Sequence, residues 1–122
     1  MTRKIEDAMI SAVRAVVAGR RDWQQDNTRV QRNSVGYANV YLHNNLIAKI
    51  HAAGAAWRLE ISLAGWNTPT TRSRLSALCR AFVPGLNGVG TKRGQAELRY
   101  RDGRTLPIND NTFYNVSTDS NG

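Results

Sequence analysis

The stretch that decides the fold is GWNTPTTRSRL, which occupies residues 65–75. Thr68 suits the N-cap of a helix, because its hydroxyl can accept a backbone N–H of the first turn. Pro69 suits the first helical position, where no N–H is needed. The apolar residues that follow recur at helical spacing, and a Pro-Gly pair then ends the pattern. A helix is therefore predicted from Pro69 to about Phe82, with Cys79 on its buried side.

The start of this predicted helix also has the composition of an anion site. Free N–H groups and the positive end of the helix dipole favour a phosphate at a helix N-terminus. Two arginines in the same stretch add positive charge. The same residues equally suit a helix that is well capped and binds nothing. The candidate anion-binding residues here are Thr68, Thr70, Thr71, Arg72 and Arg74.

The chain before this stretch predicts one helix and three strands. Apolar residues between Thr2 and Gly19 recur at the spacing of an amphipathic helix, which the glycine ends. Residues 35–42 and 46–50 are rich in strand-forming residues, and the Asn-Asn pair between them tolerates the positive φ of a hairpin turn. Residues 57–63 alternate between apolar and polar, which predicts a strand with one face in the core.

The chain after the second helix predicts a further hairpin. A Gly-rich loop is expected first, then an alternating strand over residues 95–101, a turn at residues 102–103 and a strand over residues 105–108. Residues 113–116 suit one more short strand. These elements predict an α+β fold of two helices packed on one antiparallel sheet, in the order α-β-β-β-α-β-β.

The length of 122 residues suits a single domain, which we expect over residues 1–116 with a disordered polar tail at residues 117–122. One cysteine excludes an intramolecular disulfide, and the N-terminal residues resemble neither a signal peptide nor a membrane-spanning helix. We therefore expect an intracellular protein with no membrane partner.

The charge of the chain points to a polyanionic partner. Seventeen Lys and Arg residues stand against nine Asp and Glu, which gives a net charge of +8. Fourteen of the basic residues are arginines, whose forked guanidinium suits phosphate better than an ammonium group does. High charge also serves solubility alone, so it does not by itself identify nucleic acid as the ligand.

Two further groups of basic residues are candidate contacts for such a partner. A two-residue turn at residues 102–103 would pair Arg101 with Arg104 and place the arginines of this hairpin opposite Leu98 and Tyr100. Like charges on one face repel unless an anion binds, although a solvated face tolerates them. The candidates here are Arg99, Arg101, Arg104, Lys92 and Arg93.

The other group lies in residues 20–33, a stretch expected to form a long polar loop. Its arginines and single indole suit backbone contact and base stacking. The indole also suits an anchor that holds the loop on the core, which is the interpretation we favour. The candidates here are Arg20, Arg21 and Trp23.

Catalytic and metal chemistry have little support in the sequence. The two histidines and the cysteine are expected in separate elements, and the carboxylates are scattered over strands and turns. Two carboxylates could still meet to hold a divalent ion for phosphodiester cleavage, but no lysine stands in strand spacing with such a pair. We expect no metal, no cofactor and no enzymatic activity.

Four segments together resemble a family of small tailed-bacteriophage proteins of unknown function. The resemblance covers most of residues 3–108 and implies an origin in a phage genome and a place in the cytoplasm of the bacterial host. It supplies no activity and no catalytic residue. The segments are RKIE at residues 3–6, NTRV at 27–30, VYLHNNLIA at 40–48 and GWNTPTTRSRLSAL at 65–78.

The sequence therefore favours a nucleic-acid-binding protein that contacts the phosphate backbone of DNA or RNA with little sequence preference and without catalysis. The alternative is a host-takeover or anti-defence protein that binds and inhibits a bacterial host protein, with its basic face on an acidic surface of that protein.

Overall fold

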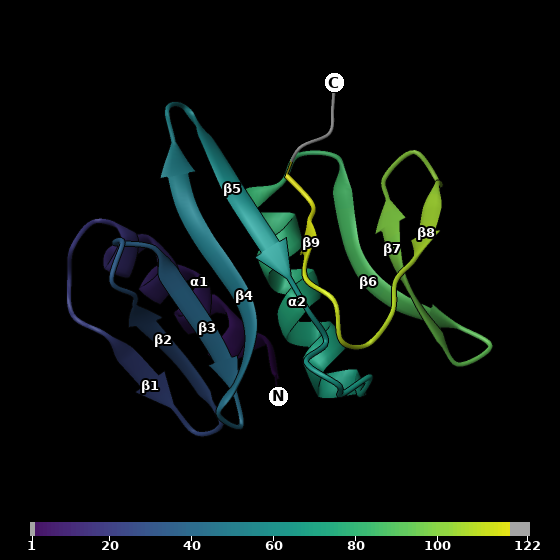
Figure 1. Ribbon diagram of the computed structural model, residues 1–122, viewed down its shortest axis with the longest axis horizontal. Coiled ribbons are helices and arrows are strands. Elements are labelled where there is room, and N and C mark those ends of the chain that lie inside the picture. Colours follow the sequence, from purple (N-terminus) through teal and green to yellow (C-terminus); the bar gives the residue numbers. More distant parts are fainter. Residues whose placement is uncertain (1, 118–122) are drawn as a thin grey trace.

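The structure is a computed structural model that describes residues 2–117, and within them it has two helices and nine strands (Figure 1). The elements are α1 (Thr2–Val17), β1 (Trp23–Gln25), β2 (Thr28–Arg32), β3 (Ala38–Leu42), β4 (Asn45–Ala53), β5 (Ala56–Ile61), α2 (Pro69–Phe82), β6 (Leu86–Lys92), β7 (Gln95–Tyr100), β8 (Thr105–Pro107) and β9 (Tyr114–Asn115).

The strands form two antiparallel sheets. The larger has six strands in the order β1-β2-β3-β4-β5-β9, and the smaller has three in the order β6-β7-β8. Figure 1 shows both helices behind the six-stranded sheet, with the three-stranded sheet beside α2. The predicted α+β class is confirmed, but the prediction of a single sheet with five strands is wrong.

The first difference lies in the segment expected to be a polar loop. Residues 20–33 contain β1 and β2, which pair so that Trp23 lies opposite Val30. Asp26 adopts a φ of 52° in the turn between them, a conformation that Asp tolerates better than most residues. Val30 is fully buried under α1, and this burial outweighs the weak strand propensity of the polar residues around it.

The second difference lies in the glycine-rich segment, which is strand β6 and not a loop. Its glycines are required by close neighbours: a Cβ at Gly88 would lie 2.5 Å from Ser76 Oγ of α2, and one at Gly90 would clash with the Arg99 guanidinium. Glycine weakens a strand in isolation, but here it permits the helix and a long side chain to approach the backbone.

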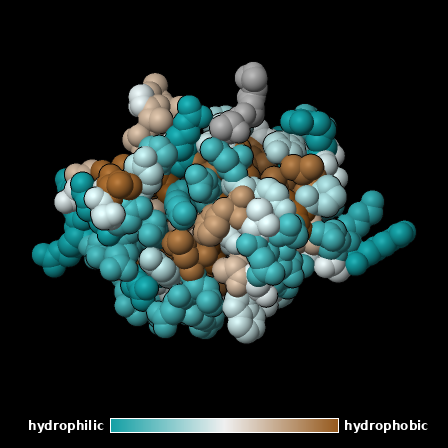
Figure 2. Space-filling view, viewed as in Figure 1, coloured by the Kyte–Doolittle hydropathy of each residue, from teal (hydrophilic) through white to brown (hydrophobic). Residues whose placement is uncertain are grey.

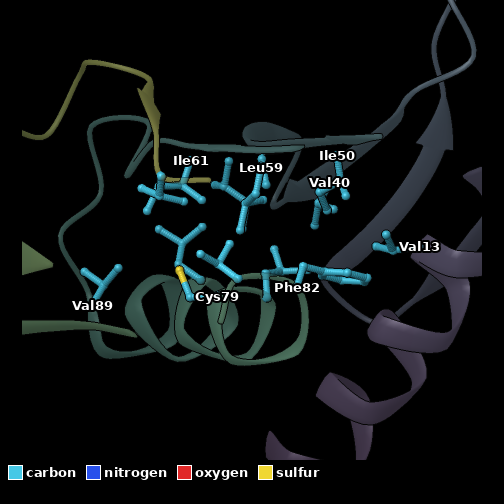
Figure 3. Close-up of a cluster of buried hydrophobic side chains, with 14 of the residues drawn as sticks. Val13, Val40, Ile50, Leu59, Ile61, Cys79, Phe82 and Val89 are labelled. Carbon is cyan, nitrogen blue, oxygen red and sulfur yellow. The ribbon is translucent and has the colours of Figure 1, made fainter. Parts of the chain in front are cut away.

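The core lies between the helices and the six-stranded sheet (Figure 3). Cys79 and Phe82 of α2 lie in the layer between this helix and the sheet, and the predicted buried side of the helix is confirmed. Burial raises the pKa of the Cys79 thiol to about 12. The apolar residues that Figure 3 labels are Val13, Val40, Ile50, Leu59, Ile61, Phe82 and Val89.

Several local predictions are confirmed. The first helix ends at Val17, and Gly19 adopts a φ of 90° just after it. The β3–β4 hairpin has its positive φ values at His43 and Asn44, one position earlier than the Asn-Asn pair. Ser117, which the sequence assigned to a polar tail, contacts strand β5, because its Oγ accepts the N–H of Leu59 at 3.1 Å. Residues 118–122 of the predicted tail lie outside the described residues.

Candidate nucleic-acid interface

The start of α2 is capped by its own residues. Thr68 is the N-cap, and its Oγ1 accepts the backbone N–H of Thr71 at 3.2 Å. Pro69 has no N–H, and the N–H of Arg72 donates to the Thr68 carbonyl at 3.0 Å. The cap therefore occupies most of the donors that the predicted anion site was expected to offer. Thr70 of this first turn is half-buried and Thr71 is buried.

The threonines of this turn face a pocket and not the arginines. The pocket has a volume of about 430 Å³ and separates the start of α2 from the β3–β4 turn. Trp66, which is 57% exposed, forms part of its wall. Among the described residues, its lining includes no arginine or lysine, so the threonines and the basic residues of this stretch lie on different surfaces.

Arg74 lies in the interior of the protein. Its Nη1 atom is 3.1 Å from Glu6 Oε2 of α1, and its Nε donates to Thr28 Oγ1 of β2 at 3.1 Å. Ser73 Oγ donates to the same Glu6 carboxylate. Only 3% of Arg74 is exposed, so this arginine joins α1, α2 and β2 from within and is not available at the surface.

Arg72 lies two positions earlier and has different surroundings. Its Nη1 donates to the Asn67 carbonyl at 3.1 Å and to Asn67 Oδ1 at 2.6 Å. Asn67 in turn donates from Nδ2 to the Gly94 carbonyl at 3.2 Å, in the turn between β6 and β7. Lys92 and Arg93 directly precede Gly94, so the structure brings two of the predicted basic groups together.

Helix α2 runs antiparallel along strand β6. Ser76 Oγ accepts the Val89 N–H at 2.9 Å and lies 3.1 Å from the Val89 carbonyl, to which it donates. Arg80 Nη1 donates to the Asn87 carbonyl near the other end, at 3.4 Å. We call this line of contact the α2–β6 seam. The cations that border it are Arg72, Arg80, Lys92, Arg93, Arg99 and Arg101.

Arg99 and Arg101 reach the seam from strand β7 and the turn that follows it. The Arg99 guanidinium crosses over Gly90, where it donates from Nη2 to the Thr91 carbonyl at 2.7 Å and from Nε to Glu97 at 3.0 Å. The backbone N–H of Arg101 donates to the Gly85 carbonyl at 2.9 Å, which fixes this residue beside the start of β6.

Arg104 does not share the face of Arg99, and the predicted arrangement of three arginines on one face is wrong. Tyr100, and not Arg101, lies opposite Arg104, because the turn contains three residues. A shift of one position turns a side chain to the other face of a strand. The Arg104 guanidinium accordingly lies 4.4 Å from the centre of the Tyr100 ring, and its Nε donates to Asp102 at 2.8 Å.

The third predicted group is not brought to the seam. Trp23 is half-buried and packs against the core, which supports its interpretation as an anchor. Arg20 and Arg21 are exposed in the connection from α1 to β1, at the opposite side of the molecule from the three-stranded sheet in Figure 1.

A further surface was not foreseen from the sequence. The open face of the six-stranded sheet, on the side away from the helices, carries aromatic rings and cations together. Each strand shows the alternation of apolar and polar residues that predicts one exposed face. The exposed residues of the separate strands come together on one surface only in the folded sheet. They are Arg29, Tyr37, Asn39, Tyr41, Lys49, His51 and Arg58, with Phe113 beside them.

Metal-ligand clusters and membrane-spanning helices are both absent from the described residues. No group of three or more His, Cys, Asp or Glu side chains among residues 2–117 is placed to hold a metal ion. In the same part of the chain, no helix is long and apolar enough to span a membrane.

Comparison with known proteins places the chain in a family. A family model described as Kyanoviridae Gp96 protein matches residues 2–120. The chain belongs to this phage protein family. The resemblance to small phage proteins noted in the sequence is thereby confirmed. No curated protein and no solved structure matches the chain.

Proposed function

We propose that this phage protein binds nucleic acid in the host cell through the phosphate backbone, without catalysis and with little sequence preference. The observation that carries the proposal is the α2–β6 seam, where the fold gathers cations from α2, the β6–β7 turn and β7 onto one strip. Cations from separate segments that line one surface are the electrostatic footprint of a polyanion-binding protein.

The balance of charge along the seam supports this proposal. Four carboxylates lie near these cations: Glu97 pairs with Arg99, Asp102 pairs with Arg104, and Glu6 and Asp7 of α1 line a groove that Arg80 also borders. Arg80, Lys92 and Arg93 are exposed, and they have no carboxylate within ion-pair distance among the described residues. They therefore remain available to neutralise phosphates.

The length of the seam suits a short run of backbone. Helix α2 has 14 residues and is about 20 Å long at 1.5 Å per residue. One strand of a duplex places a phosphate about every 3.4 Å along the axis, so the seam spans roughly six phosphates. Contacts from flexible exposed side chains to phosphates fix position but carry no sequence information, which accounts for the weak preference proposed.

The test compares two variants that each lose two neighbouring exposed charges. Lys92→Gln/Arg93→Asn removes charge at the seam, and asparagine suits the φ of 51° at position 93. Arg20→Gln/Arg21→Gln is the matched control, with the same change in net charge away from the seam. Binding of labelled 20-nucleotide single strands and 20-base-pair duplexes is measured by fluorescence anisotropy at several salt concentrations.

The seam variant is expected to bind more weakly and to lower the salt slope by about one unit for each phosphate that is no longer neutralised, while the control changes little. Equal losses in both variants would contradict the seam as the binding surface. Absence of oligonucleotide binding by the unaltered protein at low salt would overturn the proposal and leave the binding of an acidic host protein as the remaining hypothesis.

A further inference from the structure

We infer that the open face of the six-stranded sheet binds unpaired bases, so that the protein prefers single-stranded over duplex nucleic acid. This inference rests on the proposed function, because it presumes a nucleic-acid ligand. It adds a second surface, on the side of the sheet opposite the helices, that acts on the bases and not on the phosphates.

The open face is not covered by a helix of the described residues. Side chains alternate along each strand: Val40 and Ala48 turn toward the helices and are fully buried, whereas Tyr41 and Lys49 turn away and are partly exposed. Figure 2 shows the molecule from the same side as Figure 1, and its surface there is mainly hydrophilic with smaller hydrophobic patches. A protein interface is usually marked by a broader apolar area than these patches provide.

The rings on this face are stacked on one another or on a guanidinium group. Tyr37 of the loop before β3 stacks on His51 of β4, with ring centroids 3.9 Å apart and planes 10° apart. Across the neighbouring strands, the Arg29 guanidinium lies 4.3 Å from the centre of the Tyr41 ring. A nucleic-acid base can add to such a stack as one more planar ring. Aromatic side chains and guanidinium groups are the groups on which proteins stack unpaired bases.

Hydrogen-bonding groups and charge surround these rings. The Asn39 amide lies between Asn33 and Tyr41, accepting from Asn33 Nδ2 at 3.2 Å and donating to the Tyr41 hydroxyl at 3.4 Å. Lys49 lies 4.7 Å from the centre of the Phe113 ring. Amides, hydroxyls and cations beside flat rings match the edges, faces and phosphates of exposed bases.

The shape and net charge of the open face favour single-stranded over duplex nucleic acid as its ligand. A groove of about 670 Å³ runs across strands β3, β4 and β5. Of the described residues that line it, Lys49 and Arg58 are positively charged and Glu60 is negatively charged. With Arg29 beside it, the face is positive and complements a polyanion. A duplex keeps its bases stacked inside and offers such a broad sheet only its backbone, whereas a single strand can lay its bases on the rings.

The experiment removes rings and keeps charge. Tyr37→Leu/Tyr41→Leu deletes two rings of the open face, and Tyr100→Leu removes a half-buried tyrosine from the three-stranded sheet as a matched control. Single-strand and duplex affinities are measured by anisotropy for both variants and for the seam variant Lys92→Gln/Arg93→Asn. Thermal melting confirms that each variant is folded.

We expect the double tyrosine variant to lose about 5- to 150-fold in single-strand affinity, which corresponds to the loss of one stacked base, with duplex affinity unchanged. The control should change neither. Photo-crosslinking with a bromouracil-substituted single strand should label peptides that contain residues 37–41 or residue 51.

The outcomes separate this inference from the proposed function. Weaker binding in the seam variant, with no effect of the tyrosine changes, overturns the inference and leaves the proposed function standing. A single-strand loss confined to the tyrosine variant supports the inference and overturns the seam assignment. A protein that binds duplex more tightly than single strand overturns the inference whatever the variants do.

Discussion

Helix α2 has arginines on two sides with opposite surroundings. On the side toward α1, Arg74 is buried and pairs with Glu6 at 3.1 Å. On the side toward β6, Arg80 is exposed and Arg72 is half-buried against Asn67. Arg72 and Arg74 are the same residue type and lie two positions apart in the sequence. The elements that pack against each of them, and not the local motif, therefore decide whether the arginine is a buried structural residue or lies at the surface.

This contrast separates stability from binding. A buried arginine with a buried partner cannot be removed without leaving a charge in the interior, whereas an exposed one can be removed with little effect on folding. Changes at the α1–α2 contact should therefore alter the free energy of unfolding, and changes at the α2–β6 seam should alter binding.

The largest expected effect is at Arg74. Replacing it with methionine leaves the Glu6 carboxylate buried without its cation, which should lower the free energy of unfolding by about 3–5 kcal/mol in chemical denaturation. The same change at Arg72 should cost less than about 1 kcal/mol. Part of the loss should be recovered in Glu6→Leu/Arg74→Met, because no unpaired charge then remains. Equal effects at Arg72 and Arg74 would contradict the contrast between the two sides.

A smaller loss is expected at Cys79, on the core side of the same helix. Cys79→Ser places a hydroxyl among apolar side chains, which should lower stability by about 1–3 kcal/mol in thermal melting. Because burial raises the pKa of the thiol to about 12, alkylation of the native protein at neutral pH should be slow. An unchanged melting temperature with lost oligonucleotide binding would instead make the thiol functional.

Ser76 tests whether the seam is also a structural contact. Ser76→Ala removes the hydroxyl that accepts the backbone N–H of Val89, so this N–H of β6 loses its hydrogen-bond partner in α2. Stability should fall by about 1–2 kcal/mol, measured by denaturant unfolding. Ser11→Ala on the exposed side of α1 is the control and should change stability by less than about 0.5 kcal/mol. A neutral Ser76→Ala would mean that the Ser76 hydrogen bonds do not contribute to holding α2 on β6.

The smallest effect concerns a surface ion pair. Hydrogen bonds from the Arg104 backbone and side chain hold the pKa of Asp102 below its ordinary value. The resulting small stabilisation is present above the unfolded-state pKa and is lost as pH falls through the lowered folded-state pKa. In an NMR titration, Arg104→Gln should move the Asp102 pKa back toward its ordinary value, and Arg101→Gln should not. A pKa unaffected by Arg104→Gln would leave the backbone N–H as the main cause.

Local signals in the sequence predicted the helices well. The cap at Thr68, the proline after it and the apolar spacing up to Phe82 are properties of neighbouring residues, and the structure confirms the whole helix. The β3–β4 hairpin was also predicted, with its turn displaced by one residue. Strand β6 was missed because its glycines have low strand propensity, and their reason becomes apparent only beside Ser76 and Arg99.

The candidate sites were harder to predict because they depend on distant residues. Arg74 looked like a surface arginine in sequence, but its partner Glu6 is 68 positions away. Arg104 was placed on the wrong face because the turn has three residues and not two. The rings of the open sheet face lie in separate strands, so no window of sequence contained them together.

The outer strand of the smaller sheet also affects the tendency of this protein to self-associate. Strand β8 has three residues and ends at Pro107, which has no backbone N–H. A short edge that ends in proline is a poor template for a strand from another molecule. Although Leu106 is 47% exposed there, the edge should resist edge-to-edge aggregation at high expression levels.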